Sequence, residues 1–160
     1  MLCPTPQPAG LRAHLFLNNV EQGSEFYVKA FGAQVVLALG PPHGPMVHAQ
    51  LLFAGHELWL SLAQPESGHT QPSGQAPSSC RISFYSADVD AVLNDARQQG
   101  ATIERKPTDE FFGDRVAYLC DPFGHRWAVH TRREHLDHST IRQRFEQMLN
   151  ANTIKHKAPG

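Results

Sequence analysis

A chain of 160 residues is long enough for one compact domain, or for two small modules that share one core. Its hydrophobic fraction of 41% is typical of a globular protein, and no apolar run approaches the roughly 20 residues that cross a bilayer. The formal net charge of −1 gives no electrostatic reason to expect binding to nucleic acid. We therefore expect neither nucleic acid nor a membrane as a partner.

Residues 1–10 form a predicted N-terminal extension, which shows neither the basic nor the apolar region of a signal peptide. The three cysteines, Cys3, Cys80 and Cys120, are an odd number without a CxxC pair. Cys80 and Cys120 lie inside apolar, strand-like runs, which predicts reduced thiols in the core. We therefore expect a cytoplasmic protein.

Residues 11–63 are the first predicted module. Its opening residues alternate like a short strand, and Asn19 then stands three positions before Gln22, as in a capping box at the start of a helix. Apolar residues recur at helical spacing up to Gly32, a favourable residue just after a helix end. Three further strands are expected over residues 34–39, 47–53 and 57–62.

Residues 64–78 are polar and rich in glycine, proline and serine, which is typical of a linker. A second module, residues 79–131, repeats the plan, with Asp88 as the predicted N-cap of a helix that ends at Gly100. Its strands are expected over residues 80–85, 102–105, 115–120 and 126–131.

Residues 132–160 are predicted to form a C-terminal helix and tail. The helix is expected from Ser139 to about Asn150, because apolar residues there recur at helical spacing. The resulting apolar stripe consists of Ile141, Phe145, Met148 and Leu149. This stripe must cover either the domain's own flank or a partner subunit.

Landmarks of the first module recur in the second. Gly32 and Gly100 lie 68 apart (100 − 32), as do Trp59 and Trp127 (127 − 59), while Gly55 and Gly124 lie 69 apart (124 − 55). A repeat of this length, in which each copy reads strand, helix and three strands, predicts two βαβββ units that cover a shared cleft.

Alternation along each strand separates side chains that face a helix from those that face away. In the first strand Ala13, Leu15 and Leu17 form the apolar set. The opposite sets of five strands contain Arg12, His14, Phe16, His48, Gln50, Trp59, Ser61, Arg81, Ser83, Tyr85, Arg126, Ala128 and His130. Such a face is either the solvated side of an antiparallel sheet or the lining of a pocket. Agreement across both modules favours the pocket.

Three segments carry a resemblance to a known family: Phe26-Tyr27 before Ala30-Phe31-Gly32-Ala33, Phe112-Gly113-Asp114-Arg115, and residues 121–127. With the repeat, they resemble the vicinal-oxygen-chelate superfamily of glyoxalases, bleomycin-resistance proteins, fosfomycin-resistance transferases and extradiol dioxygenases. The likeness covers residues 11–131 and is greatest to the small PhnB-like bacterial branch. It implies an α+β fold of two tandem βαβββ modules that form an open, cup-shaped mixed sheet, usually in a homodimer.

In the metal-dependent members of that superfamily the cup holds a divalent ion on histidine and carboxylate ligands. Counting back from Phe26-Tyr27 places Arg12 at the first ligand position, and the others fall at or near Ser61, at Ser79 or Cys80, and at Ala128. Arginine, serine and alanine cannot replace imidazole and carboxylate as ligands for such an ion. We therefore expect neither a metal nor another cofactor.

A displaced histidine cluster is the alternative. His14 and His130 lie two residues beyond Arg12 and Ala128, and His48 could face the same space. Three imidazoles could hold Zn²⁺ or Ni²⁺, although no carboxylate ligand is evident. The protein would then be a metal-dependent lyase, isomerase or transferase.

The main hypothesis is a protein that captures a small aromatic, neutral or anionic ligand in the cup. Rings would supply stacking area, and arginine and histidine would supply hydrogen bonds or positive charge. The candidate ligand-binding residues are His14, Phe16, His48, Trp59, Arg81, Phe111, Arg115 and His130. For Arg115, a loop-fixing ion pair with its neighbourhood is an equal alternative. A third hypothesis is a dimeric interaction module whose tail helix docks a partner.

Overall fold

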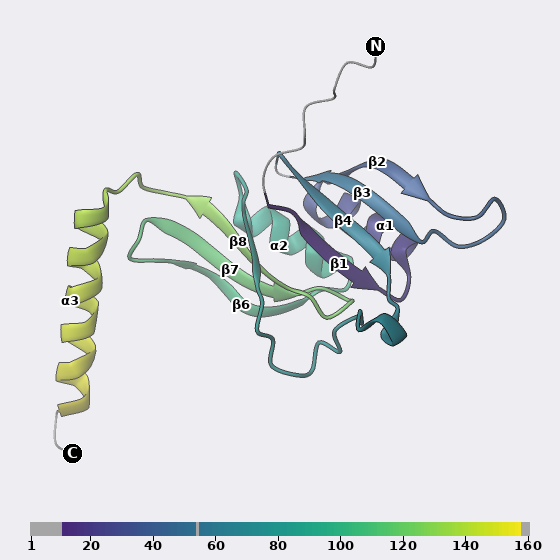
Figure 1. Cartoon of the computed structure of the whole chain (residues 1–160). Helices are drawn as coiled ribbons and strands as arrows, with labels where there is room; N and C mark the ends of the chain where they lie inside the picture. Colours follow the sequence, from purple (N-terminus) through teal and green to yellow (C-terminus); the bar gives the residue numbers. More distant parts are fainter. Residues whose placement is uncertain (1–10, 54, 158–160) are drawn as a thin grey trace, which may run out of the picture. The chain divides into compact units, whose positions relative to one another are not determined.

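The computed structural model describes residues 11–53 and 55–157, and the side chains up to residue 151 (Figure 1). The predicted extension over residues 1–10, with Cys3, lies outside the described residues. The first elements are β1 Ala13–Leu17, α1 Val20–Phe31, β2 Gln34–Leu39, β3 His48–Phe53, β4 His56–Leu62 and the 3-10 helix η1 Pro65–Ser67. The later ones are β5 Ile82–Tyr85, α2 Val89–Gln98, β6 Thr102–Asp109, β7 Asp114–Cys120, β8 Arg126–Arg132 and α3 His138–Lys157.

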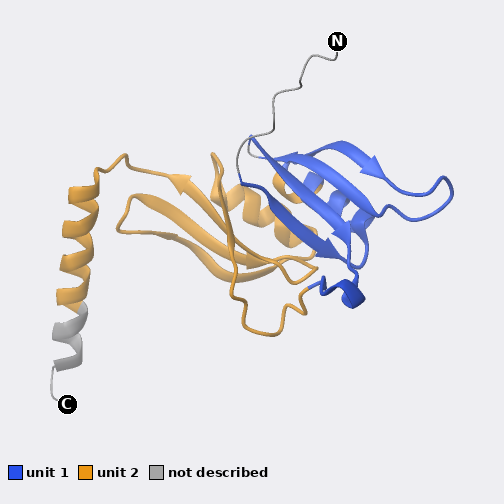
Figure 2. Ribbon diagram, in the orientation of Figure 1, with its two compact units in different colours: residues 1–28, 32–71 blue, residues 29–31, 72–160 orange. Residues whose placement is uncertain are grey.

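The chain divides into two compact units, residues 1–28 with 32–71 and residues 29–31 with 72–160 (Figure 2). Each unit contains one four-stranded mixed sheet, in the order β1-β4-β3-β2 in unit 1 and β5-β8-β7-β6 in unit 2. In each sheet the first and last strands of the module pair in parallel, and the other pairs are antiparallel. The predicted α+β fold of two tandem βαβββ modules is confirmed.

Helix α1 begins and ends where the sequence predicts. The Asn19 side chain accepts a hydrogen bond from the Gln22 amide at 3.0 Å, and Gly32 follows the last turn with a left-handed φ of 69°. On the sheet side, a β-carbon at Gly23 would overlap the Leu17 side chain. The absence of that carbon therefore lets α1 pack closely against β1.

The core of unit 1 follows the predicted alternation. One residue in two along β1, β3 and β4 is buried on the helix side: Leu15, Leu17, Ala49, Leu51, Leu58 and Leu60. Each fully buried leucine contributes roughly 1.5–3 kcal/mol of transfer free energy. This burial fixes the register, because a slip of one residue would turn every leucine towards the other face.

Unit 2 uses the same devices. The Asp88 side chain accepts hydrogen bonds from the Asp90 and Ala91 amides, and α2 buries Val89, Leu93 and Ala96 against its sheet. Strand β6 extends to Asp109, four residues beyond its predicted end. Strand β5 begins at Ile82, two residues later than predicted.

The turn between β7 and β8 is organised by a buried carboxylate. The backbone amides of Phe123 and His125 both donate to Asp121 Oδ1 at 2.9 Å. The Trp127 indole Nε1 donates to Asp121 Oδ2, also at 2.9 Å. Asp121 thus holds the turn and the largest core side chain of unit 2 together, which accounts for the motif from Asp121 to Trp127.

The two cysteines in the described chain differ in their surroundings. Cys120 is buried, and burial raises the pKa of its thiol, with the neighbouring Asp121 adding to the shift. Cys80 is exposed in the loop before β5, so the prediction that it is a core thiol is wrong. The strand predicted from Cys80 begins only at Ile82, and Cys80 therefore has no sheet to bury it.

The last helix, α3, is longer than predicted and runs to Lys157. Its contact with the rest of unit 2 includes the ring of Phe111, 5.4 Å from that of Phe145, and a bidentate pair between Arg144 and Glu134. Phe145, Met148 and Leu149 nevertheless remain substantially exposed. Among the described residues, no helix combines the length and apolar character that crossing a membrane would require.

Candidate functional site

The face of the unit 1 sheet opposite its buried leucines carries a hydrogen-bonded cluster at its centre. Ser61 on β4 lies between two imidazoles, with its Oγ 2.9 Å from His14 Nε2 on β1 and 2.9 Å from His48 Nδ1 on β3. The amide nitrogen of Gln50 lies 3.4 Å from His48 Nε2. Three neighbouring strands thus bring their polar side chains to one hydroxyl group.

Trp59 stands beside this cluster. Its ring meets those of His14 and His48 edge-on, with centroids 5.8 Å and 5.7 Å away. The Arg12 guanidinium lies over the indole at 5.2 Å, and Glu57 accepts from both Arg12 Nε, at 2.6 Å, and Trp59 Nε1, at 3.0 Å. The indole is therefore fixed in orientation while remaining partly exposed.

Phe16 continues the aromatic surface along β1. Its ring stacks on that of His69 at 4.4 Å and lies 4.7 Å from that of His14. Burial lowers the pKa of His14, and the neighbouring His48 and His69 lower it further. His14 is consequently neutral near pH 7, and it can accept a proton.

The open face of the unit 2 sheet is organised around a charge instead. Asp114, at the start of β7, is only 1% exposed. It accepts hydrogen bonds from the Tyr85 hydroxyl at 2.6 Å and from Arg132 Nε, and His130 Nδ1 lies 3.3 Å away. The hydrogen bond to Asp114 raises the pKa of the Tyr85 phenol.

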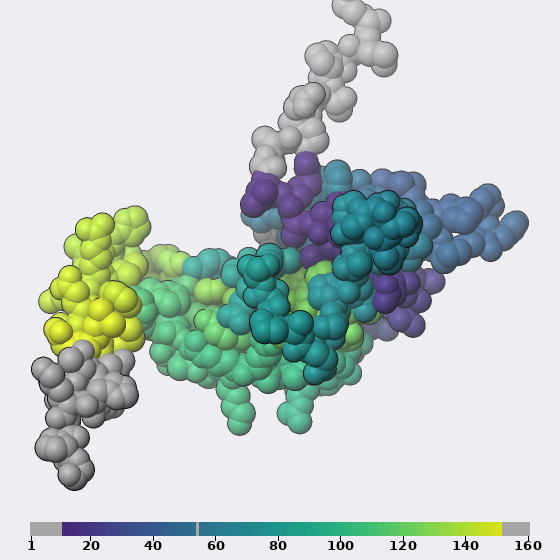
Figure 3. Space-filling view, turned by 60° about the horizontal axis from the view of Figure 1, so that its bottom comes forward, coloured from purple at the N-terminus to yellow at the C-terminus, as the bar shows by residue number. Residues whose placement is uncertain are grey.

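Arg81 and Arg126 lie further along this face. The Arg81 guanidinium stacks over the Tyr118 ring at 3.9 Å and lies 3.7 Å from Glu104. Arg126 donates to Glu104 at 2.7 Å and to the backbone carbonyls of Gly74 and Ala76. The segment around residues 74–76, teal in Figure 3, is thereby held against β8.

Two predicted ligand-binding residues lie elsewhere. Arg115 is on the helix side of β7, where it pairs with Asp90 of α2 at 2.9 Å and with Asp109 at 3.3 Å. This is the geometry of the ion-pair alternative. Phe111, in the turn between β6 and β7, packs against Phe112 and Phe145. The structure thus brings His14, Phe16, His48 and Trp59 together in unit 1, and places Arg81 and His130 on the open face of unit 2.

Three residues around Asp114 were not assigned from the sequence: Asp114 as a hydrogen-bond acceptor, Tyr85 and Arg132. Alternation had already placed Tyr85 on the open face with Ser83, and it could have added Arg132, which has the strand parity of His130. The register of β7 against β8, which sets Asp114 opposite Arg132, is decided by tertiary pairing. Within residues 11–53 and 55–157, no group of three or more His, Cys, Asp or Glu side chains is placed to hold a metal ion.

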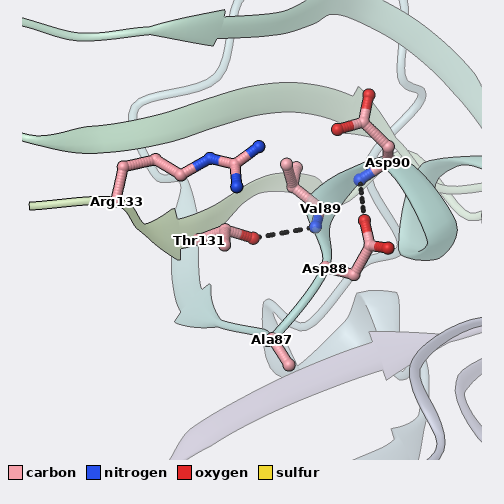
Figure 4. A pocket seen from close by; sticks show the side chains of 6 residues that line it. All are labelled: Ala87, Asp88, Val89, Asp90, Thr131 and Arg133. Atoms are coloured by element: carbon pink, nitrogen blue, oxygen red, sulfur yellow. Dashed lines mark hydrogen bonds between the residues drawn. The ribbon is translucent and has the colours of Figure 1, made fainter.

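A pocket of about 240 Å³ lies in unit 2 at the start of α2 (Figure 4). Its lining consists of Ala87, Asp88, Val89, Asp90, Thr131 and Arg133. The polar groups there serve the helix, because Thr131 Oγ1 accepts from the Val89 amide at 2.8 Å and Asp88 caps the first turn. This pocket contains none of the predicted ligand-binding residues, and we assign no site to it.

Two tandem βαβββ modules, each with polar and aromatic groups on the open face of its sheet, are the architecture that the resemblance predicted. Residues 11–129 match the Glyoxalase/Bleomycin resistance protein/Dioxygenase superfamily. The chain belongs to this superfamily.

Two mycobacterial relatives share 32% identity with the chain over 126 residues. These are the uncharacterized protein Mb0911c of Mycobacterium bovis and the uncharacterized protein Rv0887c of Mycobacterium tuberculosis. The alignments cover 77% of this chain, with 82% of the first relative and 74% of the second.

Solved structures share the fold at lower identity. TioX from Micromonospora sp. ML1 has a TM-score of 0.61 at 20% identity, over 78% of this chain and 99% of TioX. The fosfomycin resistance protein FosX from Listeria monocytogenes, in complex with Mn(II) and sulfate, has a TM-score of 0.62 at 14% identity. That match covers 88% of this chain and 99% of FosX.

Proposed function

We propose that the protein binds a small aromatic, neutral or anionic ligand on the open sheet faces, without a metal ion. The observation that carries this proposal is the convergence of His14, Ser61 and His48 beside the Trp59 ring. Polar groups from three strands meet there next to exposed aromatic surface, which is the usual composition of a small-molecule site. In unit 1 the proposed binding residues are His14, Phe16, His48 and Trp59.

In unit 2 we propose Arg81 and His130 as binding residues. The His130 ring is held between Asp114 and the Tyr85 ring, whose centroid is 5.2 Å away, and its side chain remains 17% exposed. Arg115 pairs with Asp90 on the helix side of β7, and Phe111 packs against Phe112 and Phe145, so the proposal that they contact the ligand rests on the sequence alone. That both open faces line one cup stays a prediction.

The divalent metal of related enzymes does not suit the side chains at the expected ligand positions. Arg12 is paired with Glu57, Ser61 is bridged by two imidazoles, and Ala128 offers only a methyl group. Of the alternative trio, His14 and His48 belong to unit 1 and His130 to unit 2, and a displaced metal site stays a prediction. Elemental analysis of protein purified without chelator tests it. Stoichiometric Ni, Zn, Mn or Fe would refute the proposal of metal-free binding and favour a metal-dependent lyase, isomerase or transferase.

Ligand binding is tested by thermal shift and calorimetry with a matched panel of aryl carboxylates, aryl amides and polyamines. We expect stabilisation by aromatic compounds, quenching of Trp59 fluorescence, and loss of both in Trp59→Ala. Val28→Ala, at an exposed position of α1 outside the cluster, is the control that should bind normally. Stabilisation by polyamines alone would contradict the proposal.

We also propose that the protein is a cytoplasmic homodimer of the PhnB-like branch. Apolar side chains are exposed along β2, at Val35, Val36, Leu37 and Leu39, and on α3, at Phe145, Met148 and Leu149. Exposed apolar surface of this kind is typical of subunit contacts. Sedimentation analysis of the full chain and of a chain truncated after Arg133 distinguishes the two surfaces. If α3 forms the dimer contact, the truncated chain is monomeric, and if β2 forms it, the truncated chain stays dimeric. A full-length chain that is monomeric at high concentration would refute the dimer.

A further inference from the structure

We propose that the open face of unit 1 holds a subsite for a carboxylate or phenolate group on a flat ring, and that this anion binds together with a proton taken up by His14. The inference rests on the proposed function and specifies its ligand. It follows from the direction in which hydrogen bonds can run through Gln50, His48, Ser61 and His14.

The chain of donors has one order when the proton of neutral His14 is on Nδ1. The Gln50 amide nitrogen, as assigned, is only a donor, so His48 Nε2 accepts and the His48 proton is on Nδ1. His48 Nδ1 then donates to Ser61 Oγ, and in the tautomer of His14 that leaves Nε2 unprotonated the single hydroxyl proton of Ser61 points to His14 Nε2. The Ser61 hydroxyl proton is therefore used inside the cluster.

Protonation of His14 reverses one of these bonds. With a proton on Nε2, His14 donates to Ser61 Oγ, which already accepts from His48. A hydroxyl oxygen accepts two hydrogen bonds and donates one, so the Ser61 proton is released to an external acceptor. His48 is the wrong residue for this step, because a proton on its Nε2 would face the donor nitrogen of Gln50.

An anion is the acceptor that stabilises this state. His14 is surrounded by Arg12 just before β1, by His48 on β3 and by His69 beyond η1, while Glu57 on β4 is already paired with Arg12 and Trp59. Without a ligand, the surroundings of His14 therefore disfavour a positive charge on its ring. A bound carboxylate or phenolate would offset it, accept the freed Ser61 proton and leave its ring against Trp59 and Phe16.

The test compares benzoate with benzamide, which has nearly the same shape and no charge. Nuclear magnetic resonance of the imidazole C–H protons follows the ionisation of His14 in the full chain with each compound. We expect benzoate to raise the pKa of His14 and benzamide to leave it unchanged. Above the titration range of the free protein, benzoate affinity should fall about tenfold per pH unit, the change expected when one proton is bound with the anion.

Variants divide the two roles. His14→Gln should abolish the pH dependence of benzoate binding, whereas Ser61→Ala should keep proton uptake but weaken benzoate selectively. Ser139→Ala, which removes an exposed hydroxyl at the start of α3, is the matched control and should bind as the wild type. Equal, pH-independent binding of benzoate and benzamide would overturn this inference and leave the proposed function intact. Failure of every aromatic compound to bind would overturn both.

Discussion

Trp59 and Trp127 occupy similar places in the two repeats but opposite faces of their sheets. Leu58 pairs with Ala13 in unit 1, as Trp127 pairs with Ile82 in unit 2, and both are buried. Their separation is 69 residues (127 − 58), equal to that of Gly55 and Gly124, whereas the tryptophans are 68 apart. The residue of unit 2 equivalent to Trp59 is therefore Ala128, and one residue of offset turns a core side chain into a surface ring.

The open faces of the two sheets also differ in the side chains that they carry. In unit 1 a neutral chain of imidazole, hydroxyl and amide groups lies beside an indole. In unit 2 a buried carboxylate gathers an arginine, a tyrosine and a histidine. In unit 1 the protons of the hydrogen-bonded groups can be rearranged at little cost. In unit 2 the carboxylate of Asp114 is already hydrogen-bonded to neighbouring side chains. This contrast is why we place the main ligand contacts in unit 1.

Replacing each tryptophan by alanine should give the largest contrast. Trp127 is 0% exposed and is bonded to Asp121, so Trp127→Ala should cost roughly 3–5 kcal/mol of unfolding free energy. Trp59→Ala should cost roughly 1 kcal/mol and remove ligand binding. Urea denaturation and calorimetry measure the two effects, and similar losses of stability would show that the faces have been assigned wrongly.

The two equivalent glycines should differ next. Gly124 has a φ of 90°, and a β-carbon there would overlap the carbonyl of Pro72, so Gly124→Ala should cost roughly 2–4 kcal/mol. Gly55 has a similar φ of 79°, but among the described residues other than its chain neighbours no heavy atom lies within 4 Å of such a carbon. Gly55→Ala should cost only about 1 kcal/mol. Thermal unfolding of both variants checks this ranking, which fails if Gly55→Ala is the more damaging change.

Removing the charge at the centre of unit 2 should have a smaller effect. Asp114→Asn removes the negative charge and one of the two acceptor oxygens that Tyr85 and Arg132 use, and we expect a loss of roughly 2 kcal/mol. Because the bond to Asp114 raises the pKa of Tyr85, the substitution should lower that pKa. Ultraviolet titration against the variant Tyr85→Phe isolates the phenol. An unchanged Tyr85 titration would mean that Asp114 does not bind this hydroxyl in solution.

The smallest predicted effect is a pH dependence of stability from unit 1. The pKa of His14 is lowered below its usual 6.5 by burial and by His48 and His69. The unfolded chain then binds more protons than the folded chain below about pH 6.5, so stability falls as the pH decreases through this range. His14→Gln should unfold with a weaker acid dependence than the wild type, and His43→Gln, in an exposed loop, is the control. If the melting temperatures of all three proteins fall equally with decreasing pH, His14 does not contribute to the acid dependence of stability.

Local signals in the sequence accounted for most of the fold. Asn19 and Asp88 marked the helix starts because their side chains cap exposed backbone amides, and strand alternation separated the core leucines from the open faces. Strand ends were less predictable: the sequence predicted a strand from Cys80, yet pairing with β8 begins only at Ile82. The end of an apolar run does not determine where a partner strand stops.

The sequence by itself determined which residues could share a face: His14, Phe16, Trp59 and His130 all followed from strand parity, since a period of two needs no knowledge of neighbours. Only the tertiary structure decided which of them meet. Ser61 bridges His14 and His48 because β4 lies between β1 and β3, and Arg115 turns to Asp90 because α2 covers its side of β7. Such contacts join residues far apart in the chain, and they depend on register and helix packing that no local pattern encodes.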